Sequence, residues 1–231
     1  MNPKDRLIVA LDVDSKERAE RLVAELGPHV GMFKVGKELF TSEGPEVVRS
    51  IVAGGGRVFL DLKFHDIPNT VAKAVGTAAQ LGAFFVTVHI SGGRAMLEAA
   101  ASALPAEGTQ LLGVTVLTSH TDESLQETGA LGTVAETVGR LARLAWESGI
   151  DGVVCSPHEI VMIREVAGDD LLIVTPGIRP KGSARSDQAR VMTPLEARKL
   201  GCDYIVVGRP IIEAASPADA AKAIVNELSR G

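Results

Sequence analysis

The sequence predicts an α/β protein of the (β/α)8-barrel (TIM-barrel) class. About eight short apolar runs occur in its 231 residues, and a segment with helical periodicity follows each of them. The runs LLIVT (171–175) and YIVVG (204–208) are continuously apolar, which is typical of parallel strands covered on both faces. A doubly wound open sheet is the alternative. It would need a glycine-rich nucleotide turn after the first strand, and LDVDSKE (11–17) contains no glycine.

The first half of the chain is expected to form four strand–helix units. The first strand is rich in branched residues (LIVALDV), and Ser15 is placed to cap the helix that follows it. The run Gly54-Gly55-Gly56 is expected to end the second helix. The predicted strands are 7–13, 32–35, 57–63 and 84–89, and the predicted helices are 16–26, 43–53, 69–81 and 93–104.

The second half repeats the same alternation. Pro157 is expected at the first position of its helix, where a missing N–H costs nothing. The predicted strands are 110–117, 152–155, 171–175 and 204–207, and the predicted helices are 133–148, 157–166, 194–200 and 211–228. The connection 176–192 is unusually long and basic, and long loops in compact domains are usually functional or disordered. With no linker visible, we expect one domain over 1–231.

Composition excludes several classes of function. Aromatic residues make up only 3% of the chain, too few for base-stacking platforms, and the net charge of -5 disfavours binding to nucleic acid. No apolar stretch approaches the roughly 18 residues of a membrane span, and no signal peptide is expected. Cys155 and Cys202 show neither a CxxC nor a zinc spacing. We therefore expect a cytoplasmic protein without nucleic-acid or membrane partners.

Charged residues gather where the predicted strands end. In a barrel, the carboxyl ends of the strands form the active-site face. A barrel kept only for its structure would not need charge at so many of these ends. The residues at or just after the ends of the predicted strands, most of them ionisable, are Asp12, Lys34, Asp61, Lys63, His89, Thr118, Arg179, Gly208 and Arg209.

Asp61 and Lys63 carry the strongest chemical signal. They lie two residues apart on a predicted strand, so both side chains should point to the same face. Lys34 from the adjacent strand 32–35 and Asp66 just after the strand of Lys63 could complete an alternating cluster of two ammonium and two carboxylate groups. Such a cluster is costly to desolvate and could present a lysine as general acid. An ion-pair network at the rim is the alternative explanation.

Gly208-Arg209-Pro210 opens the last helix and suggests a phosphate site. Backbone N–H groups and one arginine there could bind an anion, and barrels often hold phosphate after strands seven and eight. Arg179 and Gln188, from the long connection, could close over it. A solvated arginine in an ordinary helix turn is the alternative. Thr118 could contact a substrate or merely cap a loop. Cys155 has no activating base nearby in the sequence and is expected to be a packed thiol.

Taken together, these motifs resemble the orotidine 5′-phosphate decarboxylase family over essentially the whole chain. DLKFHDIPNT (61–70) is the most specific of them. The others are LDVD (11–14), FKVG (33–36), VTVHISGG (86–93), VTVLTS (114–119), TPGIRP (175–180), SDQAR (186–190) and VVGRPI (206–211). Small departures are Ser186, where the family commonly has an acid, and Ile90, where a small residue is common.

The resemblance implies a cofactor-free and metal-free decarboxylation of orotidine 5′-monophosphate to uridine 5′-monophosphate. Lys63 would protonate the ring carbon, Asp61 would lie against the substrate carboxylate, and Lys34 and Asp66 would complete the charge array. It also implies a homodimer, in which Asp66, and with it Thr70, reaches the neighbouring subunit's site. The substrate-binding residues it implies are Asp12, Lys34, Ile67, Thr70, Thr118, Arg179, Gln188, Gly208 and Arg209.

Two other functions remain open on the residues alone. A related barrel that acts on sugar phosphates would use magnesium to stabilise an enediolate, but Lys34 stands where that branch needs a carboxylate. A barrel that only binds a phosphorylated nucleotide is the second alternative, although binding alone needs no proton donor such as Lys63.

Overall fold

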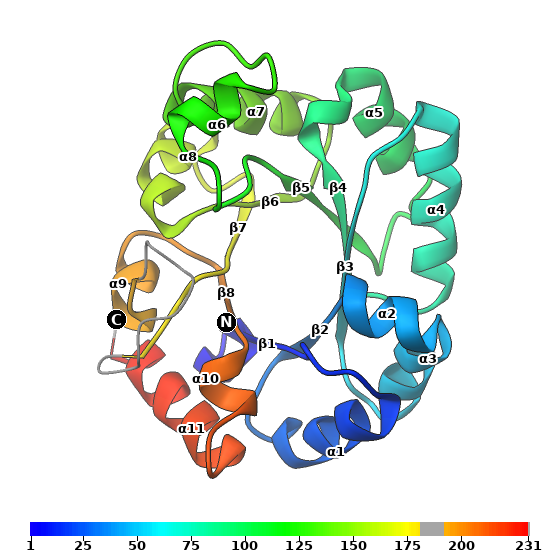
Figure 1. The fold of residues 1–231 in the computed structure, drawn as a ribbon, viewed down its shortest axis with the longest axis vertical. Helices are drawn as coiled ribbons and strands as arrows, with labels where there is room; N and C mark the ends of the chain where they lie inside the picture. Colours follow the sequence, from blue (N-terminus) through cyan, green and yellow to red (C-terminus); the bar gives the residue numbers. More distant parts are fainter. Residues whose placement is uncertain (181–191, 231) are drawn as a thin grey trace.

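The computed structural model describes residues 1–180 and 192–230 and shows a closed barrel of eight parallel strands (Figure 1). Each strand pairs with the next along the chain, and β8 pairs with β1 to close the sheet. The fold class predicted from the sequence is therefore confirmed. The strands are β1 (Leu7–Ala10), β2 (Met32–Gly36), β3 (Val58–Phe64), β4 (Phe85–His89), β5 (Gln110–Val114), β6 (Gly152–Val154), β7 (Leu172–Thr175) and β8 (Tyr204–Val207).

Helices surround the barrel as an outer ring (Figure 1). The larger ones are α1 (Lys16–Leu26), α3 (Glu46–Ala53), α4 (Pro68–Gln80), α5 (Arg94–Ser102), α7 (Val134–Glu147), α8 (Ile160–Ala167) and α11 (Pro217–Leu228). Shorter helices are α2 (Lys37–Glu43), α6 (Asp122–Gln126), α9 (Pro194–Lys199) and α10 (Arg209–Ile212), with 3-10 turns η1 (Pro3–Arg6), η2 (Ile90–Gly92) and η3 (Pro157–Glu159).

Several predicted boundaries were wrong for identifiable reasons. The segment 43–53 is the end of α2 followed by α3, because Gly44 adopts φ +66° and Pro45 follows it. The last predicted helix is likewise two helices, since Ser216 caps a new one that begins at Pro217. Helix α6 was not predicted, although Thr121 provides a capping box for it. Ser15 occupies the expected cap position of α1 without a side-chain hydrogen bond.

The apolar core has two layers separated by the strands. One layer fills the space between the sheet and the helices, and the other fills the barrel interior. The interior layer consists of Ile8, Ala10, Met32, Phe59, Phe85, Leu112, Val174, Tyr204 and Val206. Because strand side chains alternate between the two sides, the next inward position along each strand lies at the carboxyl end of the barrel. The interior layer therefore forms an apolar floor beneath the inward-facing residues at the carboxyl end of the barrel.

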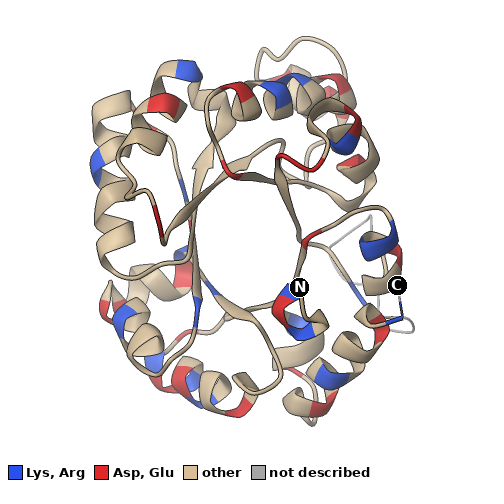
Figure 2. Cartoon of the chain, turned by 180° about the vertical axis from the view of Figure 1, so that it is seen from behind, with Lys and Arg blue, Asp and Glu red and all other residues tan. Residues whose placement is uncertain are grey.

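Charged residues lie mostly on the helices and loops rather than on the strands, as Figure 2 shows. Within the described ranges, none of the helices has the length and apolar character that crossing a membrane requires.

Candidate active site

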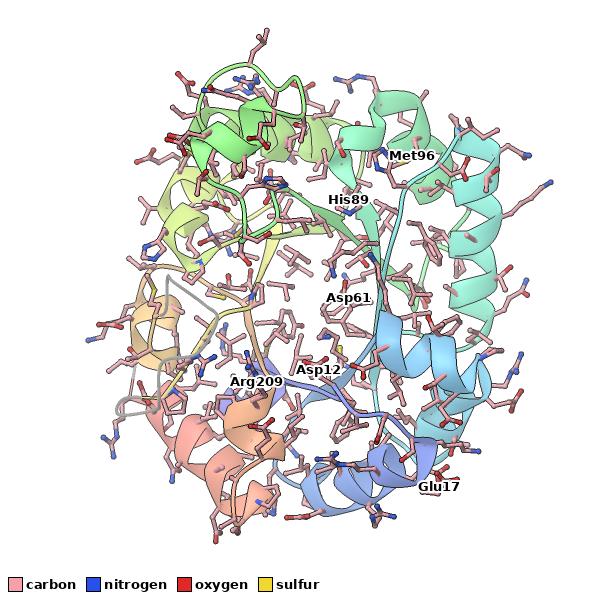
Figure 3. The ribbon with its side chains drawn as sticks, in the orientation of Figure 1. Asp12, Glu17, Asp61, His89, Met96 and Arg209 are labelled. Atoms are coloured by element: carbon pink, nitrogen blue, oxygen red, sulfur yellow. The ribbon has the colours of Figure 1, made fainter. Side chains whose placement is uncertain are left out.

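A cavity of about 280 Å³ opens at the carboxyl ends of the barrel strands. Its deeper part is apolar, and its mouth carries charged and polar groups from several strands. The lining residues are Ala10, Asp12, Lys34, Phe59, Asp61, Lys63, Val114, Val116, Leu117, Thr118, Val154, Cys155, Pro176, Gly177, Val206 and Gly208. In Figure 3, Asp12 and Asp61 lie inside the ring of helices, whereas Glu17 lies on the outside of α1.

Four charged side chains form a continuous row of alternating sign in this cavity. Lys63 Nζ donates to both oxygens of Asp61, at 2.8 Å each. Lys34 Nζ lies 3.9 Å from Asp61 Oδ2 and donates to Asp12 Oδ1 at 3.2 Å. The structure thus brings together Asp12, Lys34, Asp61 and Lys63, which lie on β2, on β3 and just beyond β1.

The central part of this row is shielded from solvent. The Asp61 side chain is 12% exposed and that of Lys34 is 15% exposed, whereas Asp12 at the outer end is 53% exposed. Removing ions from water costs several kcal/mol each unless partners compensate, and here Asp61 faces two ammonium groups. A row of this kind places fixed charges at defined points of the cavity, where they act more strongly than in bulk water.

An irregularity in β3 brings the Lys63 side chain toward the Asp61 carboxylate. In the pairing of β3 with β4, Leu60 lies opposite Val86 but Phe64 lies opposite Val88, so β3 carries extra residues in between. Lys63 lies in this bulge with φ +55°, the only positive φ among the described non-glycine residues. The prediction from strand spacing, that Asp61 and Lys63 share a face, therefore holds through a bulge and not through regular pleating.

His89 at the end of β4 lies beside the charged row. Burial lowers the pKa of His89, and so do the neighbouring charges of His65, Lys37 and Lys63. The imidazole is therefore neutral at pH 7, and it adds no further positive charge next to Lys63.

Gly208 and Arg209 follow β8 at the same end of the barrel (Figure 3). A Cβ atom at position 208 would lie 3.2 Å from Asp12 Oδ2 and 3.4 Å from Ala10 Cβ, so a larger residue would crowd Asp12. Arg209 begins α10 and is exposed. Arg179 is half-buried, and its backbone N–H donates to the carbonyl of Met192 across the long connection. Gln188 lies outside the described residues.

The remaining predicted site residues lie around the mouth. Thr118 is exposed and lines the cavity. Asp66, Ile67 and Thr70 lie at the start of α4 and are all exposed, with Ile67 retaining 66% of its accessible surface. Asp66 Oδ1 accepts a hydrogen bond from the Ile67 N–H. Within the described part of the chain, no ion pair joins Asp66 to Lys34 or Lys63.

Some residues of the site were missed by the sequence reasoning. Ala10, Phe59 and Val206 form its floor, and each stands two residues before a predicted site residue, so strand alternation could have found them. Thr87 was also missed: it stands two residues after the inward-facing Phe85, so alternation could place it on the inner face but could not show that it contacts both Asp61 and Lys63. Cys155 is buried as expected, and burial raises the pKa of its thiol well above the usual value.

Comparisons with known proteins agree with this geometry. The orotidine 5′-phosphate decarboxylase / HUMPS family matches residues 5–224. The chain is 52% identical to an orotidine 5′-phosphate decarboxylase of Moorella thermoacetica over 99% of this chain and 94% of that protein. It is 55% identical to one from Halorhodospira halophila, covering 97% and 96%.

A solved structure of the enzyme from Lactobacillus acidophilus is similar to this chain, with a TM-score of 0.86 and 43% identity over 96% of this chain and 98% of that one. A second, from Pyrococcus horikoshii, has a TM-score of 0.79 and 30% identity over 97% and 99%. These matches cover nearly every element that builds the cavity. The chain therefore belongs to the orotidine 5′-phosphate decarboxylase / HUMPS family.

Proposed function

We propose that this protein decarboxylates orotidine 5′-monophosphate to uridine 5′-monophosphate in pyrimidine biosynthesis, without a cofactor. The observation that carries the proposal is the charged row Asp12–Lys34–Asp61–Lys63, shielded from solvent at Lys34 and Asp61, in a cavity of a chain from this family. The reaction leaves an electron pair on a ring carbon that has no obvious delocalising group. The described residues can stabilise this electron pair electrostatically, through charged groups held at fixed positions near the ring carbon.

In this mechanism Lys63 and Asp61, which carry opposite charges, act on different groups of the substrate. The substrate carboxylate lies next to Asp61, and its C–C bond breaks with the electron pair remaining on the ring carbon. The Lys63 ammonium stabilises that pair and then transfers a proton to it, while carbon dioxide leaves. Loss of neutral carbon dioxide moves the negative charge from the carboxylate beside Asp61 to the ring carbon, and the proton from Lys63 then neutralises it. Lys34 holds Asp61 from its other side, at 3.9 Å.

Groups remote from the reacting carbon supply binding energy. Asp12 and Lys34 hold the ribose hydroxyls, and Thr118 contacts the pyrimidine. The 5′-phosphate is bound by Gly208, Arg209, Arg179 and Gln188. Binding energy from the phosphate can be used to hold the carboxylate beside Asp61, where like charges would otherwise keep it away.

The exposed start of α4 supports a homodimer with shared sites. Asp66, Ile67 and Thr70 are exposed, and the apolar Ile67 keeps 66% of its surface in the single chain. We assign Asp66, Ile67 and Thr70 to the neighbouring subunit's cavity, where Asp66 would extend the row of charges. The protein is proposed to act in the cytoplasm as one domain over residues 1–231.

The magnesium-dependent reaction on sugar phosphates is the second candidate, because the name of the matching family joins orotidine 5′-phosphate decarboxylase with a second group, HUMPS. The contacts of Asp61 disfavour it. Lys63 Nζ contacts both Asp61 oxygens, and Lys34 Nζ lies near one of them. A divalent cation at Asp61 would have to displace one ammonium group and lie beside another.

The test is the loss of orotidine 5′-monophosphate absorbance with purified protein in EDTA, with Lys63→Ala and Lys73→Ala measured in parallel. Lys73 lies exposed on α4, away from the cavity. The proposal expects turnover in EDTA, near-complete loss in Lys63→Ala and full activity in Lys73→Ala. Activity that EDTA abolishes and magnesium restores would favour the second candidate. Tight binding of the nucleotide without turnover would indicate a barrel that only binds it.

A further inference from the structure

Thr87 stands out among the buried polar residues of the barrel. It lies in the middle of β4, between the inward-facing Phe85 and His89, and its exposed surface is 0%. It is not one of the described residues that line the cavity. A hydroxyl buried in this way costs free energy unless it is hydrogen-bonded, so its partners indicate why it is there.

Both partners of the Thr87 hydroxyl belong to the proposed catalytic pair. Thr87 Oγ1 accepts a hydrogen bond from the Lys63 backbone N–H at 2.8 Å and donates one to Asp61 Oδ1 at 3.1 Å. The directions are fixed by chemistry, because an amide N–H can only donate and an ionised carboxylate can only accept. The single hydroxyl proton therefore goes to Asp61.

The position of Thr87 in the sheet explains the contact with Lys63. Thr87 lies opposite the β3 bulge, between Val86, which pairs with Leu60, and Val88, which pairs with Phe64. Its hydroxyl accepts the N–H of Lys63, the residue with φ +55°. A left-handed conformation is unfavourable for a lysine, and a hydrogen bond to the buried hydroxyl of the neighbouring strand stabilises it.

The contact with Asp61 fixes the rotation of its carboxylate. Oδ1 accepts from Thr87 and Lys63, while Oδ2 accepts from Lys63 and lies near Lys34. Without Thr87, the ammonium groups alone would define the carboxylate plane, and both are on flexible side chains. Thr87 thus ties the backbone of one reacting residue to the side chain of the other.

We propose that Thr87 is a positioning residue that holds Asp61 and Lys63 in their reactive arrangement without touching the substrate. This inference rests on the proposed function, since it assigns Thr87 to the same reaction. A positioning residue lowers the barrier by keeping charges in place before the reaction, so its loss should reduce kcat more than it raises KM.

The experiment compares Thr87→Val, which keeps the branched shape and removes the hydroxyl, with Thr87→Ser, which keeps the hydroxyl and removes the methyl group. We expect Thr87→Val to lower kcat on the order of tenfold to a hundredfold, with KM nearly unchanged. Thr87→Ser should stay within a few-fold of the wild type. Equal losses in both variants, or a kcat in Thr87→Val like that of the wild type, would overturn the inference.

Thr115→Val is the matched control. Thr115 is also buried in the barrel wall, but its hydroxyl donates to the backbone carbonyl of Val154 and not to Asp61 or Lys63. This variant should lose stability and keep kcat. A comparable fall of kcat in Thr115→Val would show that any lost barrel hydroxyl slows the enzyme, and would overturn the specific role of Thr87. If Thr87→Val does not fold, Thr87→Ala against Thr87→Ser makes the same comparison.

Crystal structures of the wild type and of Thr87→Val separate this inference from the proposed function. If the wild type does not decarboxylate orotidine 5′-monophosphate, the proposed function is wrong, but the geometry can still be judged. The positioning role expects the Asp61 carboxylate to rotate or the Lys63 φ to leave its positive value in the variant. An unchanged Asp61–Lys63 arrangement without the hydroxyl would refute it.

Discussion

Lys63 combines the proposed proton donor with an unfavourable backbone conformation, and the two can be separated by substitution. We predict that Lys63→Gly is more stable than Lys63→Ala, although alanine normally stabilises a chain relative to glycine. Both variants lose the same ammonium group and the same contact with Asp61, so these losses cancel in the comparison. The difference that remains comes from the backbone at φ +55°.

Two opposing contributions set the difference in the free energy of unfolding between Lys63→Gly and Lys63→Ala. A left-handed conformation costs a non-glycine residue roughly 1–2 kcal/mol, which glycine avoids. Glycine loses about 0.5–1 kcal/mol through the greater entropy of its unfolded chain. The net expectation is that Lys63→Gly exceeds Lys63→Ala by about 0.5–1 kcal/mol in the free energy of unfolding. For a chain of this size, such a difference shifts Tm by roughly 2–3 °C.

The assay is urea denaturation of the two variants, with the same pair made at Lys73 as control. Lys73 is exposed in the interior of α4, where glycine should be less stable than alanine by about 1 kcal/mol. The order of the two residues should therefore reverse between the sites, a contrast of roughly 1.5–2 kcal/mol. If Lys63→Ala is as stable as Lys63→Gly or more so, the claim of backbone strain at Lys63 is refuted.

Three further predictions follow from the described residues. Arg209→Ala should raise KM for the phosphorylated substrate at least tenfold and spare the unphosphorylated nucleoside, because one charged contact to phosphate is lost; equal losses on both would contradict the phosphate assignment. Inactive Asp66→Ala and Lys63→Ala proteins, mixed and allowed to exchange subunits, should regain up to about a quarter of wild-type activity, since a mixed dimer with shared sites keeps one intact site; proven exchange without recovery would exclude sharing. Burial raises the pKa of Cys202 from 9.0 to about 12, so the free energy of unfolding should fall as the pH rises from about 9 to 12. Urea titrations across that range should show a smaller fall in Cys202→Ala, and an equal fall would remove Cys202 as its cause.

The helical boundaries show where local sequence signals are enough and where they are not. The glycine run after Ala53 ends α3 as predicted, and Gly55 takes a positive φ. The predicted helix began at residue 43, so α2 was missed and the break at Gly44-Pro45 was placed inside a helix. Periodicity reports which face is buried, whereas a break depends on the conformation of one or two residues.

The barrel and most of the charged row follow from patterns within the sequence. Alternating strands and helices specify the fold, and strand alternation places Asp12, Lys34 and Asp61 on inward positions above the apolar floor. These features depend on a period of two residues along each strand, which the chain displays directly.

The way in which Lys63 reaches Asp61, and the contacts that hold the pair together, depend on how the strands pack in three dimensions. The β3 bulge, the positive φ of Lys63 and the two hydrogen bonds of Thr87 arise from the pairing of β3 with β4. These two strands are linked by α4, so Thr87 lies 24 residues from Lys63 in the chain. Strand alternation can place the Thr87 side chain on the inner face of β4, but its two contacts exist only when β3, with its bulge, is packed beside β4.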